Sequence, residues 1–198
     1  MSQSHPDAAL IAACIEHVTN LLDHIVDGDD LDTASYRRTR DLITAARAQS
    51  LNGLIARATA AMIEGANSFY RQGDPGSLAL LWSWRLVDDL VRMTWDEAST
   101  SNPDAALIAA CAGHVAIFKA YIANESDLEA VAYQRSHDAI NSARPHTLAG
   151  MVALAAAAKV ERANPLHYGG GDLTAPATVW ALRLAECLMR LGADAGRA

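Results

Sequence analysis

The chain has 198 residues and a formal net charge of −7, and 51% of its residues are hydrophobic although only 6% are aromatic. This length can bury a core as one domain or as two small ones. Much of the apolar content is alanine, the strongest helix former. The acidic balance argues against a nucleic-acid partner, because phosphate backbones are bound by clustered Lys and Arg.

The cysteine content indicates the redox environment of the protein, and the length of its apolar runs indicates whether it spans a membrane. Three cysteines form an odd and sparse set, unlike the even sets of secreted disulfide scaffolds. The apolar run over residues 151–158 is much shorter than the roughly 20 residues of a membrane span. We expect a soluble protein of the cytoplasm, with reduced thiols and no membrane partner.

Two stretches of the sequence match at an offset of 97 positions. The residues SHPDAALIAACIEHV, which begin at Ser4, align with SNPDAALIAACAGHV, which begin at Ser101. Farther along, an offset of 98 aligns Trp82 with Trp180. Self-similarity of this kind indicates a duplicated structural unit. Further aligned identities are Ile25/Ile122, Asp30/Asp127, Leu31/Leu128, Tyr36/Tyr133, Arg38/Arg135, Asp41/Asp138, Arg47/Arg144, Gly53/Gly150, Glu64/Glu161, Asn67/Asn164, Arg85/Arg183 and Arg92/Arg190.

The repeat predicts two helical units, over 4–95 and 101–192, that pack together as one compact body. No stretch shows the alternation of a strand, so we predict an all-α fold. Its architecture would be a tandem duplication of a roughly 95-residue four-segment unit, arranged as a pseudo-twofold helical bundle. The predicted segments cover about 6–26, 32–48, 50–67 and 77–94 in the first unit and about 103–123, 129–144, 147–164 and 175–191 in the second.

Local signals place the helix ends. Ser4 is the expected N-cap of the first segment, with a proline and Asp7 in its first turn, and Gly28 is the expected stop. Ser50 and Thr147 are the expected N-caps of the third segments. Apolar residues at steps of three and four predict one buried face on the first segment of each unit. They are Leu10, Cys14, Val18, Leu21, Leu22 and Ile25, and then Leu107, Cys111, Val115, Phe118 and Ile122.

Several stretches are similar to those of a known group of proteins. The opening PDAALIAAC and the later stretches ARPHTLAGMVALAAAA and ARAQSLNGLIARATAA resemble an uncharacterised helical protein group of alphaproteobacteria, with a PDAxLIxxC opening. The resemblance covers most of both units and implies the helical fold. It implies no activity, no catalytic residue and no cofactor.

A cysteine and a histidine three positions apart occur in both units. Cys14 and His17 recur as Cys111 and His114. If the first segments packed against each other, these four side chains could form a tetrahedral Cys2His2 zinc site. The alternative is core packing, because both cysteines lie on the predicted apolar face and a free cysteine behaves as a small hydrophobe. The sequence favours packing and no cofactor, with zinc as the alternative.

Other patterns are interpreted structurally. Residues 27–32 (DGDDLD) resemble the start of a calcium-binding EF-hand loop, but Asp32 stands at loop position six, which needs Gly, and Arg38 stands at position twelve, which needs Glu. This stretch is expected to be a helix end followed by acids that favour the next N-terminus. The glycines at 169–171 are expected to be a flexible connector, and the tryptophans to pack in the core. The recurring Tyr36, Arg38 and Asp41 lie on a polar segment, where Arg38 and Asp41 are expected to pair.

No serine or cysteine has a discernible base and orienting acid, so the sequence favours a non-enzyme. The first hypothesis is a protein-interaction or structural module that works through a protein partner or self-association. The alternative is a small-ligand or metal-binding protein with its site at the interface of the two repeats.

Overall fold

The computed structural model describes residues 5–27, 30–70, 77–93, 102–124, 130–163 and 175–195. These residues form helices joined by short turns and irregular segments, with no strand among them, which confirms the all-α prediction. The expected N-cap at Ser4, the stop at Gly28 and the glycines at 169–171 lie outside the described residues. The helices are α1 (Ala8–Leu22), the single π-helical turn η1 (Asp23–Asp27), α2 (Thr33–Ala45), α3 (Leu51–Tyr70), α4 (Ser77–Arg92), α5 (Ala105–Asn124), α6 (Ala130–Ser142), α7 (Leu148–Arg162) and α8 (Pro176–Ala195).

The four helices of each half pack in the same order. α3 packs against α1 and α4, and α2 lies against α1. Likewise, α7 packs against α5 and α8, and α6 lies against α5. The two halves meet where α3 packs on α8, α4 on α7 and α4 on α8. One hydrophobic core runs through both halves and contains Trp82, Leu86, Trp180 and Leu184.

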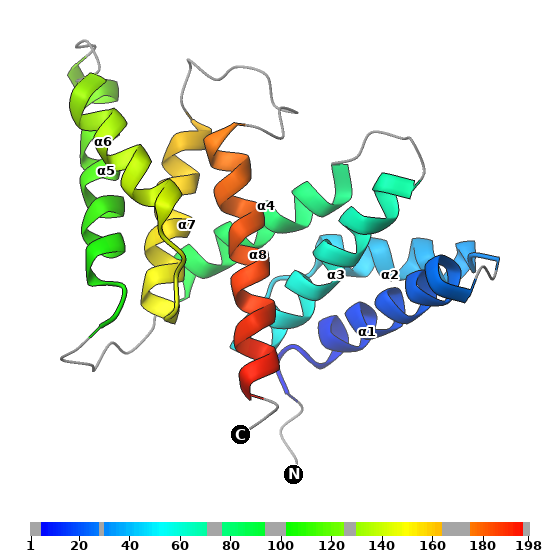
Figure 1. Cartoon of the computed structure of the whole chain (residues 1–198). Coiled ribbons are helices and arrows are strands. Elements are labelled where there is room, and N and C mark those ends of the chain that lie inside the picture. Colours follow the sequence, from blue (N-terminus) through cyan, green and yellow to red (C-terminus); the bar gives the residue numbers. More distant parts are fainter. Residues whose placement is uncertain are drawn as a thin grey trace.

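The first helices of the two halves lie far apart. α1 lies at one side of the molecule and α5 at the opposite side (Figure 1). They are not among the helix pairs that pack against each other in the described part of the chain. The pairing of first segments that a shared Cys2His2 site required is therefore wrong for this structure. The reason is that α3, α4, α7 and α8, rather than α1 and α5, carry the apolar faces that join the halves.

α1 buries a face shifted from the predicted one. Val18 is half-buried and Leu22 is 38% exposed. The difference arises because α1 is apolar on two sides, and packing against α2 and α3 selects one of them. The buried residues are Leu10, Ala13, Cys14, His17 and Leu21.

One stretch of the described residues meets the length and composition of a membrane span. It covers Ala8–Val26, which includes α1. A helix that packs in a protein core can meet the same criterion, and α1 packs against α2 and α3. This stretch is therefore weak support for a membrane span.

A carboxylate joins the start of α1 to the start of α3. Asp7 is the N-cap residue of α1 but makes no cap hydrogen bond to that helix, contrary to the predicted first-turn role. Its carboxylate instead accepts hydrogen bonds from the Gln49 N–H (3.0 Å) and the Ser50 hydroxyl (2.6 Å). The Ser50 hydroxyl in turn accepts from the Gly53 N–H at 3.2 Å, so the predicted N-cap is confirmed.

The second half repeats this junction. Asp104 accepts hydrogen bonds from the N–H groups of His146 (2.9 Å) and Thr147 (2.7 Å). The Thr147 hydroxyl accepts from the Gly150 N–H at 3.1 Å, which confirms the second predicted N-cap. The glycine is needed because a Cβ at position 150 would lie 2.1 Å from Asp104 Oδ2.

Replacing Gly150 with alanine should lower the free energy of unfolding by about 1–3 kcal/mol. The new Cβ would displace the Asp104 carboxylate from its donors, and urea unfolding measures the loss. Gly113→Ala is the matched control, because a Cβ there meets nothing within 4 Å. Alanine should stabilise that helical position by up to about 1 kcal/mol. Equal stability of G150A and the wild type would contradict the prediction.

Candidate functional site

His17 on α1 is the centre of a buried polar cluster in the first half. Its Nδ1 lies 3.0 Å from Thr39 Oγ1 on α2, and its Nε2 lies 3.1 Å from Glu64 Oε2 on α3. The Tyr36 hydroxyl on α2 donates to Glu64 Oε1 at 2.8 Å. Trp82 on α4 meets the imidazole edge-on, with 5.0 Å between ring centroids. Four helices thus contribute, and the imidazole is 0% exposed.

Residues 97 or 98 positions later make the same contacts. His114 Nδ1 lies 3.0 Å from Ser136 Oγ, and His114 Nε2 lies 2.9 Å from Glu161 Oε2. The Tyr133 hydroxyl donates to Glu161 Oε1 at 3.0 Å, and Trp180 meets the imidazole edge-on at 5.2 Å. We call these two groups the histidine clusters.

The sequence showed that His17, Tyr36 and Glu64 recur but did not predict that their side chains contact each other. It grouped His17 with Cys14 and left the recurring Tyr36 and Glu64 without a role. The structure joins His17 to Tyr36 and Glu64, which come from three helices. Recurrence at one offset was the available signal, but recurrence does not say which helix faces meet.

The recurring arginine on α2 also differs from its prediction. Arg38 pairs with Glu16 on α1 rather than with Asp41, and Asp41 pairs with Arg40 at 2.8 Å. Both partners of the Arg38–Glu16 pair are about half-exposed. Such a surface pair contributes little to stability, at most about 1 kcal/mol.

Each histidine cluster places a hydroxyl, an imidazole and a carboxylate in the order found in serine hydrolase triads. The Ser136 hydroxyl lies 2.8 Å from the Tyr133 carbonyl of its own helix, and His114 is 0% exposed. A substrate cannot reach the imidazole in this conformation. The arrangement instead satisfies buried polar groups and holds helices in register, because buried networks of this kind rigidify a core. Burial and the neighbouring Glu161 raise the pKa of the Tyr133 phenol above its ordinary value.

The cysteines lie in the core beside the histidine clusters. Cys14 and Cys111 are each 1% exposed and free. Burial raises the pKa of each thiol to about 12. Both ring nitrogens of His17 and of His114 contact side chains of their own half. The described residues hold no group of three or more His, Cys, Asp or Glu side chains with metal-binding geometry. The structure does not bring the four predicted zinc ligands together.

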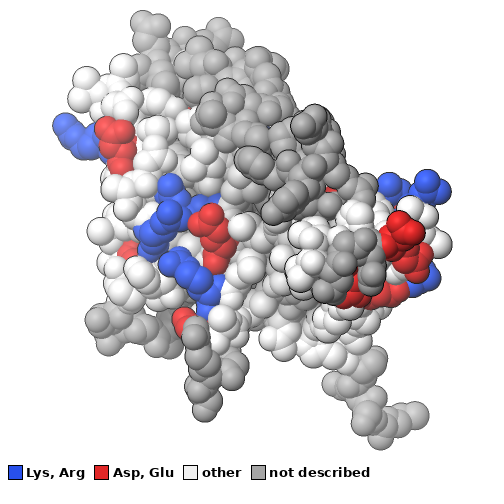
Figure 2. All heavy atoms as spheres, turned by 45° about the vertical axis from the view of Figure 1, so that its right-hand side comes forward, with Lys and Arg blue, Asp and Glu red and all other residues white. Residues whose placement is uncertain are grey.

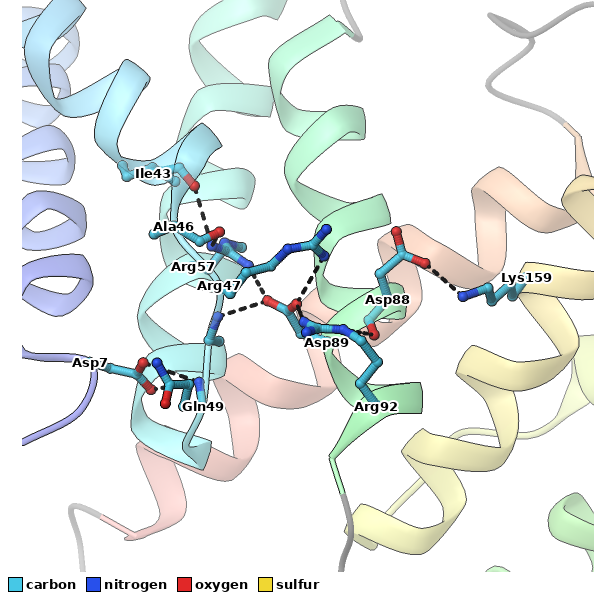
Figure 3. A network of polar contacts seen from close by, with 11 residues as sticks. Asp7, Ile43, Ala46, Arg47, Gln49, Arg57, Asp88, Asp89, Arg92 and Lys159 are labelled. Atoms are coloured by element: carbon cyan, nitrogen blue, oxygen red, sulfur yellow. Dashed lines mark hydrogen bonds and ion pairs between the residues drawn. The ribbon is translucent and has the colours of Figure 1, made fainter.

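A buried ion pair closes the end of α2 in the first half. Arg57 on α3 and Asp89 on α4 are both 0% exposed and pair with each other. Arg57 also donates to the carbonyls of Ile43 (3.3 Å) and Ala46 (2.9 Å), where α2 ends. Asp89 accepts the N–H of Ala48 at 2.9 Å (Figure 3).

The second half closes α6 with an arginine from another helix. Arg183 on α8 donates to the carbonyls of Ile140 (2.8 Å) and Ala143 (3.1 Å). It aligns with Arg85, whereas Leu154 occupies the position aligned with Arg57. The buried acid is also missing, because Cys187 aligns with Asp89.

A second difference between the halves accompanies the replacement of Asp89 by Cys187 at the aligned position. Asp89 accepts the N–H of Ala48, but the position aligned with Ala48 is Pro145, which has no N–H. The second half therefore lacks both the donor and the acid that would receive it. Cys187 is 1% exposed, and its thiol lies 2.9 Å from an N–H nitrogen of Arg190.

Replacing Tyr133 with phenylalanine should lower the free energy of unfolding by about 1–2 kcal/mol, because the buried Glu161 loses a donor. Tyr121→Phe is the control, since the Tyr121 ring packs on Phe118 but its hydroxyl has no hydrogen-bond partner among the described residues. That change should stay within about 0.5 kcal/mol. Urea unfolding measures both variants, and equal losses would contradict a bridging role for Tyr133.

We expect a chelator to leave the melting temperature unchanged. Cys14→Ala and Cys111→Ala should each cost about 1 kcal/mol, as small core truncations do. Thermal unfolding with and without EDTA, together with elemental analysis, separates packing from zinc binding. Stoichiometric zinc and a large fall in melting temperature with EDTA would instead support the Cys2His2 site, because structural zinc contributes on the order of 10 kcal/mol.

Comparisons with known proteins do not assign the chain to a family. No protein-family model matches the chain, and no curated protein and no solved structure is significantly similar to it. The resemblance to alphaproteobacterial helical proteins therefore stays a prediction from the sequence. What the protein can do follows from its own contacts, burial and charges.

Proposed function

We propose that this protein is a non-enzymatic protein-interaction module that binds a basic amphipathic helix of a partner protein along α1. We further propose that the module is a tandem duplication with pseudo-twofold symmetry. Three features support the duplication. They are the aligned identities, the two histidine clusters, and the matching contacts between the halves, in which the third helix of each half packs on the fourth helix of the other (α3 on α8 and α7 on α4).

The observation that carries the proposal is a second apolar side on α1. We call it the α1 stripe. Among its residues, Ile15 is 62% exposed, Leu22 is 38% exposed and Val26 in η1 is 73% exposed. Steps of three and four residues keep its members on one side of the helix. The stripe consists of Ile11, Ile15, Val18, Leu22 and Val26.

A groove runs beside the α1 stripe. It lies between α1 and α3, has a volume of about 180 Å³ and is mostly apolar. Its α3 side is made of the small residues Ala56 and Thr59, which allow another helix to approach closely. A row of apolar residues at helical spacing beside a groove is the surface that binds an amphipathic helix. The groove is lined by Cys14, Ile15, Val18, Thr19, Ala56 and Thr59.

Charge indicates which helix fits. Residues 8–27 contain Glu16, Asp23 and Asp27 but no lysine or arginine, and of these acids Glu16 pairs with Arg38 of α2. The whole chain carries a charge of −7, so two copies repel each other. A partner helix with apolar residues on one side and Lys or Arg on the other matches both the stripe and its acidic surroundings.

The aligned surface of α5 keeps Ile108 and Val115 but replaces exposed apolar residues of the stripe. Ala112 occupies the position of Ile15, and Lys119 occupies the position of Leu22. Both are exposed. The second half therefore supplies a built-in comparison surface on the same fold.

A synthetic 18-residue amphipathic helix with leucine on one side and lysine on the other is the probe. The full-length protein should bind it, and Ile15→Asp should weaken binding by about tenfold or more. The added negative charge would favour a basic peptide, so a loss of affinity reports the lost apolar contact. Titration followed by tryptophan fluorescence or calorimetry measures the dissociation constant.

Ala112→Asp is the matched control, because it adds the same charge at the aligned exposed position of α5. It should leave the affinity within about twofold. A peptide with glutamate in place of lysine should bind more weakly. Failure of the wild type to bind the lysine peptide, or equal binding by I15D, would reject the proposal. A dimer in light scattering that dissociates in I15D would instead assign the stripe to a second copy of the chain.

A further inference from the structure

Charged side chains of this protein gather in clusters. On the face shown in Figure 2, Lys and Arg lie beside Asp and Glu, with uncharged surface between the clusters. Three arginines surround the buried Asp89 on α4. Arg57 lies beneath it, and Arg47 and Arg92 reach it from the surface (Figure 3).

The positive charge around Asp89 exceeds what this carboxylate can neutralise. Arg57 and Asp89 are both 0% exposed and already balance each other. Arg92 also pairs with Asp89, and Arg47 lies 3.5 Å from it. Three guanidinium groups thus share one carboxylate, which leaves two positive charges in a chain whose net charge is −7. The neighbouring Asp88 does not offset them, because it pairs with Lys159 at 3.0 Å.

The two outer arginines keep access to solvent. The side chain of Arg47 is 46% exposed and that of Arg92 is 50% exposed. Arg92 also contributes to the lining of an open groove of about 320 Å³, together with Ala48, Gln49 and Met93. A guanidinium has five N–H donors in a planar fork, so Arg92, which donates to Asp89 and to the Asp88 carbonyl, keeps donors for a ligand in this groove. Arg47 does not line the groove but lies next to it, beside Ala48 and within 3.5 Å of Asp89.

The aligned groove in the second half has a different charge balance. It has a volume of about 120 Å³ and contains Arg190 together with Asp194. Arg144, aligned with Arg47, pairs with Glu186 at 3.0 Å. Counting the inner Arg183, three arginines there accompany the two carboxylates Glu186 and Asp194, whereas three arginines in the first half share the single Asp89.

We propose that the groove beside Arg47 and Arg92 binds a phosphate group. A phosphate ester carries close to two negative charges at neutral pH and several acceptor oxygens, which match two guanidinium forks and their excess charge. The group can belong to a small free anion or to a phosphorylated side chain of a partner. This site lies on α4 and the α2–α3 turn, and it is separate from the α1 stripe.

Calorimetric titration of the full-length protein with inorganic phosphate at low ionic strength tests the proposal. We expect saturable binding that weakens as salt rises, because exposed charges are screened. Arg47→Gln combined with Arg92→Gln should weaken binding by about tenfold or more. The charge-preserving pair Arg47→Lys with Arg92→Lys should retain part of the affinity. A circular dichroism melt confirms that each variant is folded.

Arg144→Gln combined with Arg190→Gln is the matched control, and it should leave the affinity within about twofold. A peptide with one phosphoserine and the same peptide with serine distinguish the two sources of phosphate. Binding of inorganic phosphate supports a free anion, and binding of the phosphorylated peptide alone supports a modified partner. If neither binds the wild type, or if both glutamine pairs lose affinity equally, the site does not exist as proposed.

Discussion

The fold depends on a buried imidazole in each half that bridges a hydroxyl on one helix and a carboxylate on another. His17 and His114 are 0% exposed, so each ring nitrogen requires a partner inside the protein. Because these partners come from the second and third helices, the first three helices of each half can meet in only one register. A tryptophan of the fourth helix packs edge-on against each imidazole. An unsatisfied member of such a network would be costly, which explains why it is complete in both halves.

The ends of α2 and α6 show that one physical requirement can be met by different residues. The last carbonyls of a helix have no partner within it, so a donor must come from outside. Arg57 on α3 supplies it in the first half and Arg183 on α8 supplies it in the second. Asp89 is present where a backbone N–H needs an acceptor, and Cys187 replaces it where Pro145 offers none. The requirement is kept although the residue identities are not.

The two halves agree in the interior and differ at the surface. The histidine clusters and the carboxylates that join the first and third helices recur with nearly the same distances. The exposed apolar stripe belongs to the first half among the described residues, and the excess of arginines is larger there, with three around Asp89 against Arg144, Arg183 and Arg190 beside Glu186 and Asp194. Interior contacts constrain each other through packing, whereas an exposed position can change without disturbing its neighbours. Surface features present in one half are therefore where a specific role for that half can lie.

The sequence by itself determined the all-helical fold, because helix caps, alanine content and apolar periodicity are local signals. It also placed the N-caps Ser50 and Thr147, whose hydroxyls act within three residues. Tertiary structure decided which residues meet. α1 has two apolar sides, and only packing shows that Cys14 and His17 face inward while Ile15 faces solvent. Likewise, Arg47 in the α2–α3 turn and Arg57 on α3 precede Asp89 by more than 30 residues and reach its carboxylate only because α3 packs on α4, whereas Arg92 is three residues from Asp89 on the same helix. Such convergence depends on how helices pack, which no local pattern specifies.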